Sequence, residues 1–509
     1  MKVFHIIAAL LVASVSALTI HQVDDGVSSL VYRAPNPVNY SLLAAQLSPG
    51  ASIVFPDNPQ FDLLQQRWQE YSRPTYSAIV QAATEDDVRK TVLFANKHSL
   101  PFLAVAGAHG FLTTLGRMQG GIAISLANMK GISLNKEGDC AELQPGLTNG
   151  ELIRYLWPRG KQAVTGNCLC TGIMGIMLGG GHGFLQGIHG LLVDQILEAS
   201  VVLANGKLVV ASPTSNPDLF WALRGAGHNF GIVTRVKYKI YNAIPKWTFS
   251  TIIFTQDKLE KVFEVANALL PEADHPAELI LMYQFVRLPI DPKSASIMIY
   301  LIWAGDSAGL DKYAARFRAL GPAQETLQTD ISYPDVFKGR EDETNPGTCA
   351  KGWYRLLFNN YLKRFNPEAL RKVHTIFTKA TDEYPDTQTR SIYVFEPYSQ
   401  QGVTAVPFES TAVPFRGYPV LASPVWGYTN ASYTNGLVAA SREMRKILTD
   451  GDGDGKLRSY VNYAFGDEAL SENYGHEPWR VKKLKALKKK YDPEGRFSFY
   501  APIDVGRRP

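Results

Sequence analysis

Apolar positions along this chain occur either in short apolar runs, which predict strands, or at intervals of three to four residues, which predict helices. The run 76–83 has the length and apolar content of a strand. Thr84 and the three acidic residues after it are typical of a helix start, because side-chain oxygens and negative charge stabilise the unpaired N–H groups of a first turn. Val88, Val92 and Ala95 recur at helical spacing. The pattern therefore predicts a strand followed by an amphipathic helix.

A second buried strand is predicted just before a turn of small residues. The apolar run 102–106 ends directly at Gly107-Ala108-His109-Gly110. Further along, Asn205-Gly206 lies between two apolar runs, which predicts a hairpin because both residues tolerate the positive φ of a tight turn. Because it follows the predicted strand 102–106, His109 is expected at a strand end, where ligands commonly bind.

The glycine content and the order of predicted helices and strands change along the chain, and this change predicts the domain organisation. From about 245 glycine becomes rarer, and helices such as 257–270 and 367–381 separate strands such as 294–303. We place one domain at 72–244, a second α+β domain at 245–455 and a C-terminal segment at 456–509.

The beginning of the chain has the features of a secretory signal peptide. One positive charge precedes the apolar stretch 6–12, and small residues up to Ala17 form a cleavage pattern, so residues 1–17 are expected to be removed and the protein secreted. A membrane anchor needs roughly 20 apolar residues, and no stretch of the chain reaches that length, so no membrane association is expected. Glycosylation patterns at Asn39 and Asn430 fit secretion.

Composition and charge exclude several function classes. A chain of 509 residues with 45% hydrophobic content can bury a large core in more than one domain. The net charge of +5 is small for this size and implies no acidic partner. Leu484 and Leu487 interrupt the lysines of 482–490 at helical spacing, which predicts a solvated helix face with a thin apolar stripe and no nucleic-acid binding.

Four cysteines in so long a chain do not form a disulfide scaffold. Cys168-Leu169-Cys170 lacks the two-residue spacer and the second pair of a zinc site, so no metal is expected. Disulfide connectivity among Cys140, Cys168, Cys170 and Cys349 cannot be deduced from sequence. For Cys168 the residues alone allow a buried hydrophobe, a disulfide partner of Cys170 or another thiol, or a nucleophile.

A glycine-rich run follows Cys168. Glycine lacks a Cβ, so its N–H group can approach and cradle a pyrophosphate, although close backbone packing uses glycine equally well. The run fits neither the dinucleotide-binding nor the phosphate-loop spacing. Two nucleophilic side chains, His109 and Cys168, beside flexible backbone suggest a tethered cofactor. The glycines of the run are Gly172, Gly175, Gly179, Gly180, Gly181 and Gly183.

The order of these motifs resembles that of the berberine-bridge-enzyme-like flavoproteins of the vanillyl-alcohol-oxidase fold. In that family a histidine after Gly-Gly bonds the flavin 8α carbon, and a cysteine eleven positions before Gly-Gly-Gly bonds flavin C6; His109 and Cys168 stand at these places. The segment 216–234 is similar to the family's Asp-Leu-Phe-Trp-Ala-Leu-Arg motif, and 491–497 to its terminal Tyr-Asp-Pro motif. Ala108 replaces the usual second glycine.

The resemblance implies a site built around covalent FAD, attached through His109 and Cys168. Tyr460-Val461-Asn462-Tyr463 is similar to a family motif whose last tyrosine is the proposed base, which carries that role to Tyr463, with Tyr460 and Asn462 supporting it or touching the flavin. An aromatic wall is the alternative role for Tyr463, because a tyrosine of pKa about 10 is a poor base. Further cofactor contacts are implied for Gly107, Ala108, Gly110, Gly172, Gly175, Gly179, Gly180, Gly183, Gly231 and Val233.

The resemblance also implies fold and activity. The expected fold is α+β: a two-domain flavoprotein whose FAD domain, of the PCMH type, carries an inserted substrate domain with an antiparallel sheet. The expected activity is a secreted, monomeric oxidase of secondary metabolism that passes hydride from a natural-product alcohol, phenol, alkaloid or polyketide to flavin N5, with dioxygen as acceptor, hydrogen peroxide as product and cyclisation as a coupled outcome. The alternatives are a carbohydrate oxidase, a flavin-dependent cyclase without net oxidation, and a secreted binding protein that has lost its flavin.

Overall fold

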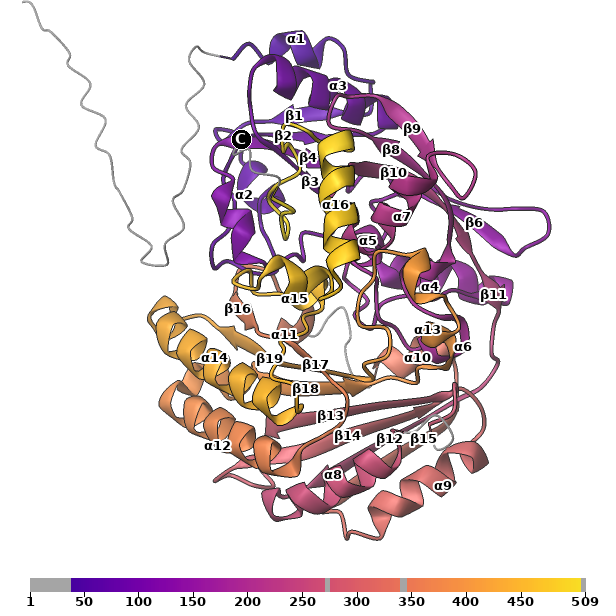
Figure 1. Ribbon diagram of the computed structural model, residues 1–509, viewed down its shortest axis with the longest axis vertical. Helices are drawn as coiled ribbons and strands as arrows, with labels where there is room; N and C mark the ends of the chain where they lie inside the picture. Colours follow the sequence, from indigo (N-terminus) through magenta and orange to yellow (C-terminus); the bar gives the residue numbers. More distant parts are fainter. Residues whose placement is uncertain (1–37, 271–274, 339–345, 505–509) are drawn as a thin grey trace, which may run out of the picture.

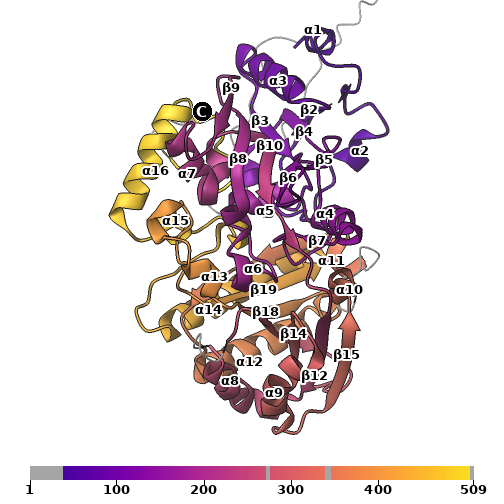
Figure 2. The same cartoon turned by 90° about the vertical axis from the view of Figure 1, so that its right-hand side faces the viewer.

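The computed structural model describes residues 38–270, 275–338 and 346–504, so the predicted signal peptide, 1–17, lies outside the described residues. The sheets of four and five strands occupy the upper half of Figure 1 and the large sheet the lower half, and the view turned by 90° in Figure 2 keeps this division. β7 (Lys161–Gln162) and β11 (Tyr241–Asn242) form a further two-stranded sheet. The molecule is therefore α+β and contains a large antiparallel sheet, as expected from the sequence.

The first small sheet has four strands in the order β1 (Ser52–Val54), β2 (Tyr76–Gln81), β4 (Gly121–Ser125) and β3 (Phe102–Val105). β2 and β3 both run parallel to β4. The predicted helix is α3 (Glu85–Lys97), and its N-cap Thr84 accepts a hydrogen bond from the N–H of Asp87. The strand, helix and second strand predicted for this region are confirmed, and β3 delivers the chain into the turn that carries His109.

The second small sheet is antiparallel, in the order β5 (Ile132–Leu134), β6 (Cys140–Leu143), β10 (Ile232–Lys239), β8 (Ile196–Val202) and β9 (Leu208–Ala211). β8 and β9 form the hairpin predicted from Asn205-Gly206. The C-terminal helix α16 (Pro478–Tyr491) packs against α7 (Pro217–Ala226), and both views show them side by side. The end of the chain thus returns to the half of the molecule that holds the two small sheets and the glycines of 172–183, which we call the glycine-rich half.

The prediction of a solvated lysine face on α16 is wrong for Lys488. Leu484 and Leu487 are buried as expected, but Lys488 is buried with them. Its Nζ lies 2.7 Å from Oδ2 of Asp492 and donates to the carbonyl oxygens of Asn229 and Phe497. A lysine can be buried when its charge is paired and its hydrogens are all used, and here it fixes the terminal turn at Asp492 and Phe497 to the loop of Asn229 before β10.

The large sheet is antiparallel, and its order is β15 (Gln324–Ile331), β12 (Trp247–Phe254), β14 (Ala295–Trp303), β13 (Leu279–Arg287), β18 (Ile392–Pro397), β19 (Val420–Tyr428) and β16 (Tyr354–Leu357), with β17 (Asn360–Leu362) paired to β19. Four helices pack on one of its faces: α8 (Leu259–Ala268), α9 (Ser307–Arg318), α12 (Pro367–Glu383) and α14 (Thr434–Gly451). The remaining short helices and strands are α1 (Ser41–Ala44), α2 (Phe61–Leu64), α4 (Asn149–Leu156), β7 (Lys161–Gln162), α5 (Ile173–Leu178), α6 (Gln186–His189), β11 (Tyr241–Asn242), α10 (Tyr333–Lys338), α11 (Pro346–Cys349), α13 (Gln401–Thr404) and α15 (Leu470–Tyr474).

Side chains alternate between the two faces of this sheet, because successive residues of a strand point to opposite sides. On β13, Tyr283 and Phe285 join the core beneath the helices. Their neighbour Gln284 lines a cavity on the other face, as does Glu396 of β18. One face of the large sheet therefore holds the core, and the opposite face offers side chains to the glycine-rich half.

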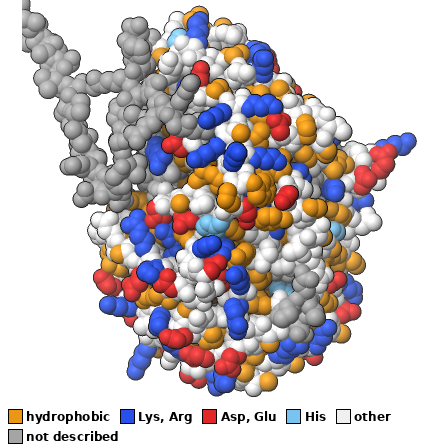
Figure 3. All heavy atoms as spheres, viewed as in Figure 1, with side chains coloured by type: hydrophobic (Ala, Val, Ile, Leu, Met, Phe, Trp, Pro, Cys, Tyr) orange, Lys and Arg blue, Asp and Glu red, His pale blue; other side chains and the backbone are white. Residues whose placement is uncertain are grey.

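Charged side chains of both signs lie on the lower part of the face drawn in Figure 3. Acidic and basic side chains are interspersed over the helices that cover the large sheet. Among the described residues no helix has the length and apolar character needed to cross a bilayer.

Candidate active site

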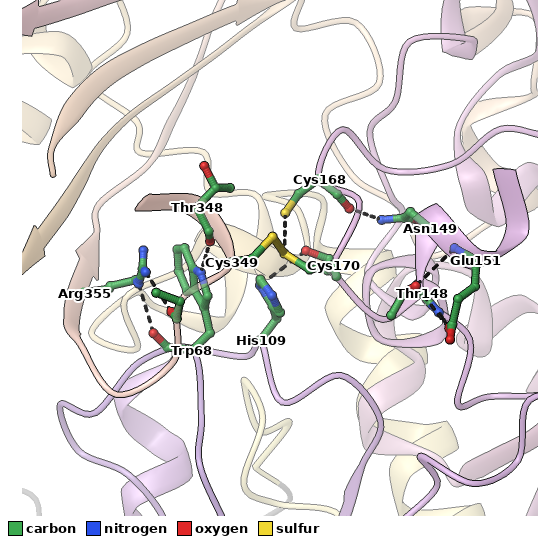
Figure 4. Close-up of a disulfide and its surroundings, with 12 residues drawn as sticks. Trp68, His109, Thr148, Asn149, Glu151, Cys168, Cys170, Thr348, Cys349 and Arg355 are labelled. Atoms are coloured by element: carbon green, nitrogen blue, oxygen red, sulfur yellow. Dashed lines mark hydrogen bonds between the residues drawn. A yellow bond between two sulfur atoms is a disulfide. The ribbon is translucent and has the colours of Figure 1, made fainter. Parts of the chain in front are cut away.

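The two predicted attachment residues lie close together in the lining of a cavity of about 700 Å³. His109 follows β3, and Cys168 lies in the loop before α5. A ring nitrogen of His109 and Sγ of Cys168 lie within 4.8 Å of one another, together with Sγ of Cys170 (Figure 4). Side chains far apart in sequence are thus brought to one point, and both line the cavity.

The predicted glycine contacts divide into two groups. Gly107, Ala108, Gly110, Gly172, Gly175, Gly231 and Val233 line the cavity, whereas Gly179, Gly180 and Gly183 lie outside its lining. A Cβ on Gly179 would lie 2.1 Å from Oδ1 of Asn462, and one on Gly183 would lie 1.9 Å from the carbonyl oxygen of Thr165. Close packing therefore accounts for Gly179 and Gly183, and the cofactor contacts predicted for these three glycines stay a prediction.

Two loops of the site touch backbone to backbone at Gly107 and Gly172. A Cβ on Gly107 would lie 2.6 Å from the nitrogen of Gly172, and one on Gly172 would lie 2.8 Å from the nitrogen of Gly107. By contrast, a Cβ on Gly175 would meet nothing within 4 Å. The contact between Gly107 and Gly172 brings the loop of His109 to the loop of Cys168. Gly175, in contrast, leaves open space in the cavity, where a cofactor can contact the backbone.

Ala108 adopts left-handed backbone, with φ of 57°. A side chain in this region costs about 1–2 kcal/mol, while glycine adds flexibility to the unfolded chain worth about 0.4–1 kcal/mol. Ala108→Gly is therefore expected to raise the free energy of unfolding by about 0.5–1 kcal/mol, measured by urea denaturation. The control Ala486→Gly, in the exposed interior of α16, should lower it by about 1 kcal/mol. Equal losses in both variants would contradict strain at Ala108.

The ring of His109 is held between polar and aromatic neighbours. It stacks on Trp68, with ring centroids 5.1 Å apart, and its Nδ1 lies 3.3 Å from Oγ1 of Thr171. Burial, followed by the positive charges of Arg355 and other cations, lowers the pKa of His109 to about 3. The imidazole is therefore neutral at ordinary pH, which is the form that has a nucleophilic nitrogen.

A disulfide joins Cys170 to Cys349 of α11, across 179 positions of sequence. Figure 4 shows it beside His109, with Cys168 on its other side. Of the alternatives that the sequence left open, Cys170 pairs with Cys349, and Cys168 stays outside the bond. The disulfide ties the large-sheet part of the chain to the glycine-rich loop.

The segment after α11 is fixed over the same point by Trp68 and Arg355. Nε1 of Trp68 donates to the carbonyl oxygen of Thr348 at 2.6 Å. The buried guanidinium of Arg355 lies 4.2 Å from the centroid of the Trp68 ring and donates to the carbonyl oxygens of Trp68 and Ala350. A buried cation thus stands close to the two attachment residues.

The C-terminal motif contributes the wall that contains the predicted catalytic residues. Tyr460, Asn462 and Tyr463 all line the cavity. The hydroxyl of Tyr460 accepts hydrogen bonds from the N–H of Gly181 and from Nδ2 of Asn462, and burial raises its pKa to about 12. Tyr460 is therefore a protonated, structural phenol. The ring of Tyr463 lies 5.2 Å from that of Tyr460, and its role as base stays a prediction.

The large sheet adds a buried carboxylate that sequence reasoning missed. Glu396 and Tyr398 lie near the end of β18 and line the cavity, and both are 2% exposed. The hydroxyl of Tyr398 donates to Oε1 of Glu396 at 2.7 Å, and Nδ2 of Asn167 lies 3.3 Å from the same oxygen. A phenol hydrogen-bonded to a buried carboxylate can pass a proton along that bond. The sequence signal was a polar residue at a cavity-facing position of an apolar strand.

His182 completes this wall as a neutral hydrogen-bonding group. Its Nδ1 lies 2.8 Å from Oε1 of Gln186, which can only accept, so Nδ1 carries the hydrogen. Nε2 then accepts from the hydroxyl of Tyr361 at 2.6 Å, and the ring stacks on Tyr398. His182 therefore fixes the position of Tyr398 and is itself fully satisfied.

Burial of several histidines predicts loss of stability in mild acid. It lowers the pKa of His182, His189, His228 and His275 to about 4, from an unfolded value of about 6.5. Between these values the unfolded chain binds more protons, so the free energy of unfolding falls as pH falls, by up to about 1.4 kcal/mol per pH unit for each histidine. Urea denaturation at pH 7, 6 and 5 measures this slope. His275→Gln should make it shallower, and an unchanged slope would contradict the pKa of His275.

The chain has relatives in both sequence and structure. A sequence family described as FAD binding domain matches residues 76–212. The chain is 39% identical over 485 residues to the FAD-linked oxidoreductase chry5 of Gibberella zeae, which covers 92% of this chain and 95% of that one. The likeness therefore extends beyond the FAD-binding segment to the large sheet.

Two solved structures show the same fold. BBE-like 1 of Physcomitrella patens is similar with a TM-score of 0.79 and 23% identity, covering 92% of this chain and 99% of that one. Glucooligosaccharide oxidase of Acremonium strictum, described with a 6-S-cysteinyl, 8α-N1-histidyl FAD, is similar with a TM-score of 0.77 and 19% identity, covering 92% and 99%. The likeness in fold therefore covers most of this chain, the small sheets and the large sheet included.

Proposed function

This chain belongs to the FAD-linked oxidoreductases with the vanillyl-alcohol-oxidase fold, and from that premise we propose that it is a secreted oxidase of a small natural product with FAD bound covalently to His109 and Cys168. The observation that carries the proposal is the meeting of these two nucleophilic side chains, within 4.8 Å, in the lining of a large cavity. Bound FAD would supply the hydride acceptor and pass the electrons to dioxygen.

The residues of the cavity fit such a cofactor. Its volume of about 700 Å³ lies within the usual range for ligand and cofactor sites. The lining includes His109, Cys168, His228 and Gly231, together with Gly175, where a Cβ would meet nothing within 4 Å. Neutral His109 offers a ring nitrogen, and Arg355 beside Cys168 favours the thiolate, which is the reactive form of cysteine.

We assign the proton-accepting role to Tyr398 and Glu396. A substrate hydroxyl loses its proton to Oη of Tyr398, while the Tyr398 proton moves to Oε1 of Glu396 over a hydrogen bond of 2.7 Å. Asn167 and His182 hold the two groups in place. Tyr463 lines the same cavity and is the alternative acceptor.

The substrate wall favours a largely apolar molecule. Met282, Val286, Ile392 and Val394 project from β13 and β18 into the cavity, with Gln284 and Glu396 as the polar groups among them. Such a surface suits an alcohol or phenol with an apolar skeleton more than a sugar, whose many hydroxyls need many partners. Oxidation of such a substrate can be followed by cyclisation.

Bleaching of the flavin by candidate substrates tests this function. Anaerobic mixing with a panel of aromatic and polyketide alcohols is expected to bleach the flavin, and air should then restore its colour with release of hydrogen peroxide. Bleaching by simple oligosaccharides alone would support a carbohydrate oxidase instead. Conversion without bleaching would support a cyclase, and a colourless protein that cannot take up FAD would support a binding protein.

Secretion and glycosylation belong to the same proposal. The interdomain disulfide fits an oxidising compartment, and Asn39 and Asn430 are both exposed in their glycosylation patterns. The same proposal includes a monomeric protein. Recovery of the glycosylated protein from the culture medium, at monomer mass in size-exclusion chromatography with light scattering, tests all three. Retention in the cell or a larger assembly would contradict them.

A further inference from the structure

Cys168 has a reactive neighbour within the protein, the disulfide between Cys170 and Cys349. Its Sγ lies 3.4 Å from Sγ of Cys170, and Cys170 is bonded to Cys349. Atoms poised to react lie about 3–3.5 Å apart. Figure 4 shows the three sulfurs gathered beside His109, so the thiol that would hold the flavin is also at attacking distance from a disulfide.

The surrounding charge favours attack. The buried guanidinium of Arg355 lies within electrostatic reach of Cys168. Burial lowers the pKa of Arg355 to about 10, and a negative charge on the sulfur of Cys168 acts in the opposite direction and raises it. The interaction is mutual, so the cation stabilises the thiolate of Cys168. Thiolates, rather than thiols, attack disulfides.

We propose that Cys168 exchanges with the Cys170–Cys349 disulfide until FAD is attached to it, and that the attachment locks this disulfide in place. In the exchange a bond forms between the sulfurs of Cys168 and Cys170, the bond to Cys349 breaks, and its electron pair leaves with Cys349 as a thiolate. One thiolate and one disulfide stand on each side, so no oxidant or reductant is consumed. The lock rests on the proposed attachment at Cys168, whereas the exchange does not.

The exchange would have a structural consequence at the site. The Cys170–Cys349 bond ties α11 to the loop before α5, and the carbonyl oxygen of Thr348 in α11 accepts from Trp68, the ring that stacks on His109. Breaking that bond removes the covalent tie between the two segments that flank His109. The flavin-free chain can therefore open at this point, and the flavin-bearing chain cannot.

Mapping of thiols in the full chain tests the exchange directly. Protein from a riboflavin-starved host and flavin-loaded protein are quenched in acid, denatured, alkylated with N-ethylmaleimide and mapped by mass spectrometry. The flavin-free chain is expected to give alkylated Cys349 with a Cys168–Cys170 bond beside the original pairing. The flavin-loaded chain and flavin-free Cys168→Ser should give only Cys170–Cys349. Cys140, which lies on β6 outside the disulfide, is the internal control for labelling.

The exchange is overturned if Cys349 escapes alkylation in the flavin-free chain as completely as in Cys168→Ser. The lock is overturned if flavin-loaded protein with flavin on Cys168 still shows alkylated Cys349. If no flavin is found on Cys168 in loaded protein, the proposed second attachment fails, while mapping of the flavin-free chain still decides the exchange.

Two variants test whether the thiol of Cys170 competes with the flavin for Cys168, or whether the Cys170–Cys349 disulfide only supports the loop of Cys168. In Cys349→Ser, the thiols of Cys168 and Cys170 should be oxidised to a disulfide, with dioxygen taking the two electrons, so flavin is lost from Cys168 and kept on His109. In Cys170→Ser/Cys349→Ser no competing thiol remains, and flavin should return to Cys168. Equal loss from Cys168 in both variants would show that the disulfide only holds the loop, contrary to the proposal.

Discussion

Glu396→Gln is expected to slow reduction of the flavin by substrate by about 10²–10⁴-fold. The amide keeps the size of the side chain but cannot take the proton that Tyr398 passes to Oε1 over 2.7 Å. Tyr398→Phe should lose a similar factor. Anaerobic stopped-flow absorbance with the substrate found by bleaching measures the rate, and the covalent flavin content should stay unchanged because neither residue is an attachment site.

Tyr393→Phe is the matched control for this prediction. Tyr393 lies on the same strand as Glu396 but points into the core beneath the helices, so the reduction rate should not change. Tyr463→Phe decides between the two proton acceptors that line the cavity. A full loss in Tyr463→Phe with a normal rate in Glu396→Gln would return the base to Tyr463 and contradict our assignment.

Arg416→Met is expected to lower the free energy of unfolding by about 3–5 kcal/mol. The guanidinium of Arg416 bonds both carboxylate oxygens of Asp194, at 2.6 and 2.9 Å, and the two side chains are 2% and 3% exposed. Removing the cation leaves the buried charge of Asp194 uncompensated. Asp194 also accepts from the N–H of Leu191, beside the residues that pair with Gly180 and Gly181, so the loss should reach the glycine-rich segment.

Two variants control for the origin of this loss. Lys446→Met breaks an ion pair with Asp450 in which both side chains are more than half exposed, and such pairs contribute only about 0–1 kcal/mol. Asp194→Asn/Arg416→Met removes both charges and should recover part of the stability. Urea denaturation measures all three. A double variant less stable than Arg416→Met would contradict an uncompensated charge as the cause.

Sequence reasoning succeeded where chemistry is carried by residues next to one another. The apolar run before Gly107 predicted β3 and therefore the place of His109, and Thr84 with its acidic neighbours predicted the start of α3. The pairing of His109 with Cys168 came from the order of motifs, because nothing in local periodicity says which two loops will cross. The crossing itself depends on Gly107 and Gly172, whose backbones touch.

Features that depend on tertiary contacts were not predictable. The Cys170–Cys349 bond joins residues 179 positions apart, and spacing alone does not distinguish it from other pairings. The sequence predicts Lys488 as a surface lysine, whereas in the structure its ammonium is bound by Asn229, Asp492 and Phe497. The proposed proton-accepting pair at the end of β18 was missed because the two-residue spacing of Glu396 and Tyr398 is ordinary for any strand, and only the facing cavity distinguishes these two residues.

The central claim is covalent FAD on both His109 and Cys168, and mapping of flavin peptides tests it most directly. The secreted protein is precipitated in acid, digested and analysed by mass spectrometry, with His109→Ala and Cys168→Ser as paired variants. We expect yellow precipitate, one flavin joined to peptides of both residues, and a single remaining attachment in each variant. Flavin that leaves entirely with the supernatant would contradict the account, and flavin on His109 alone would refute the attachment at Cys168.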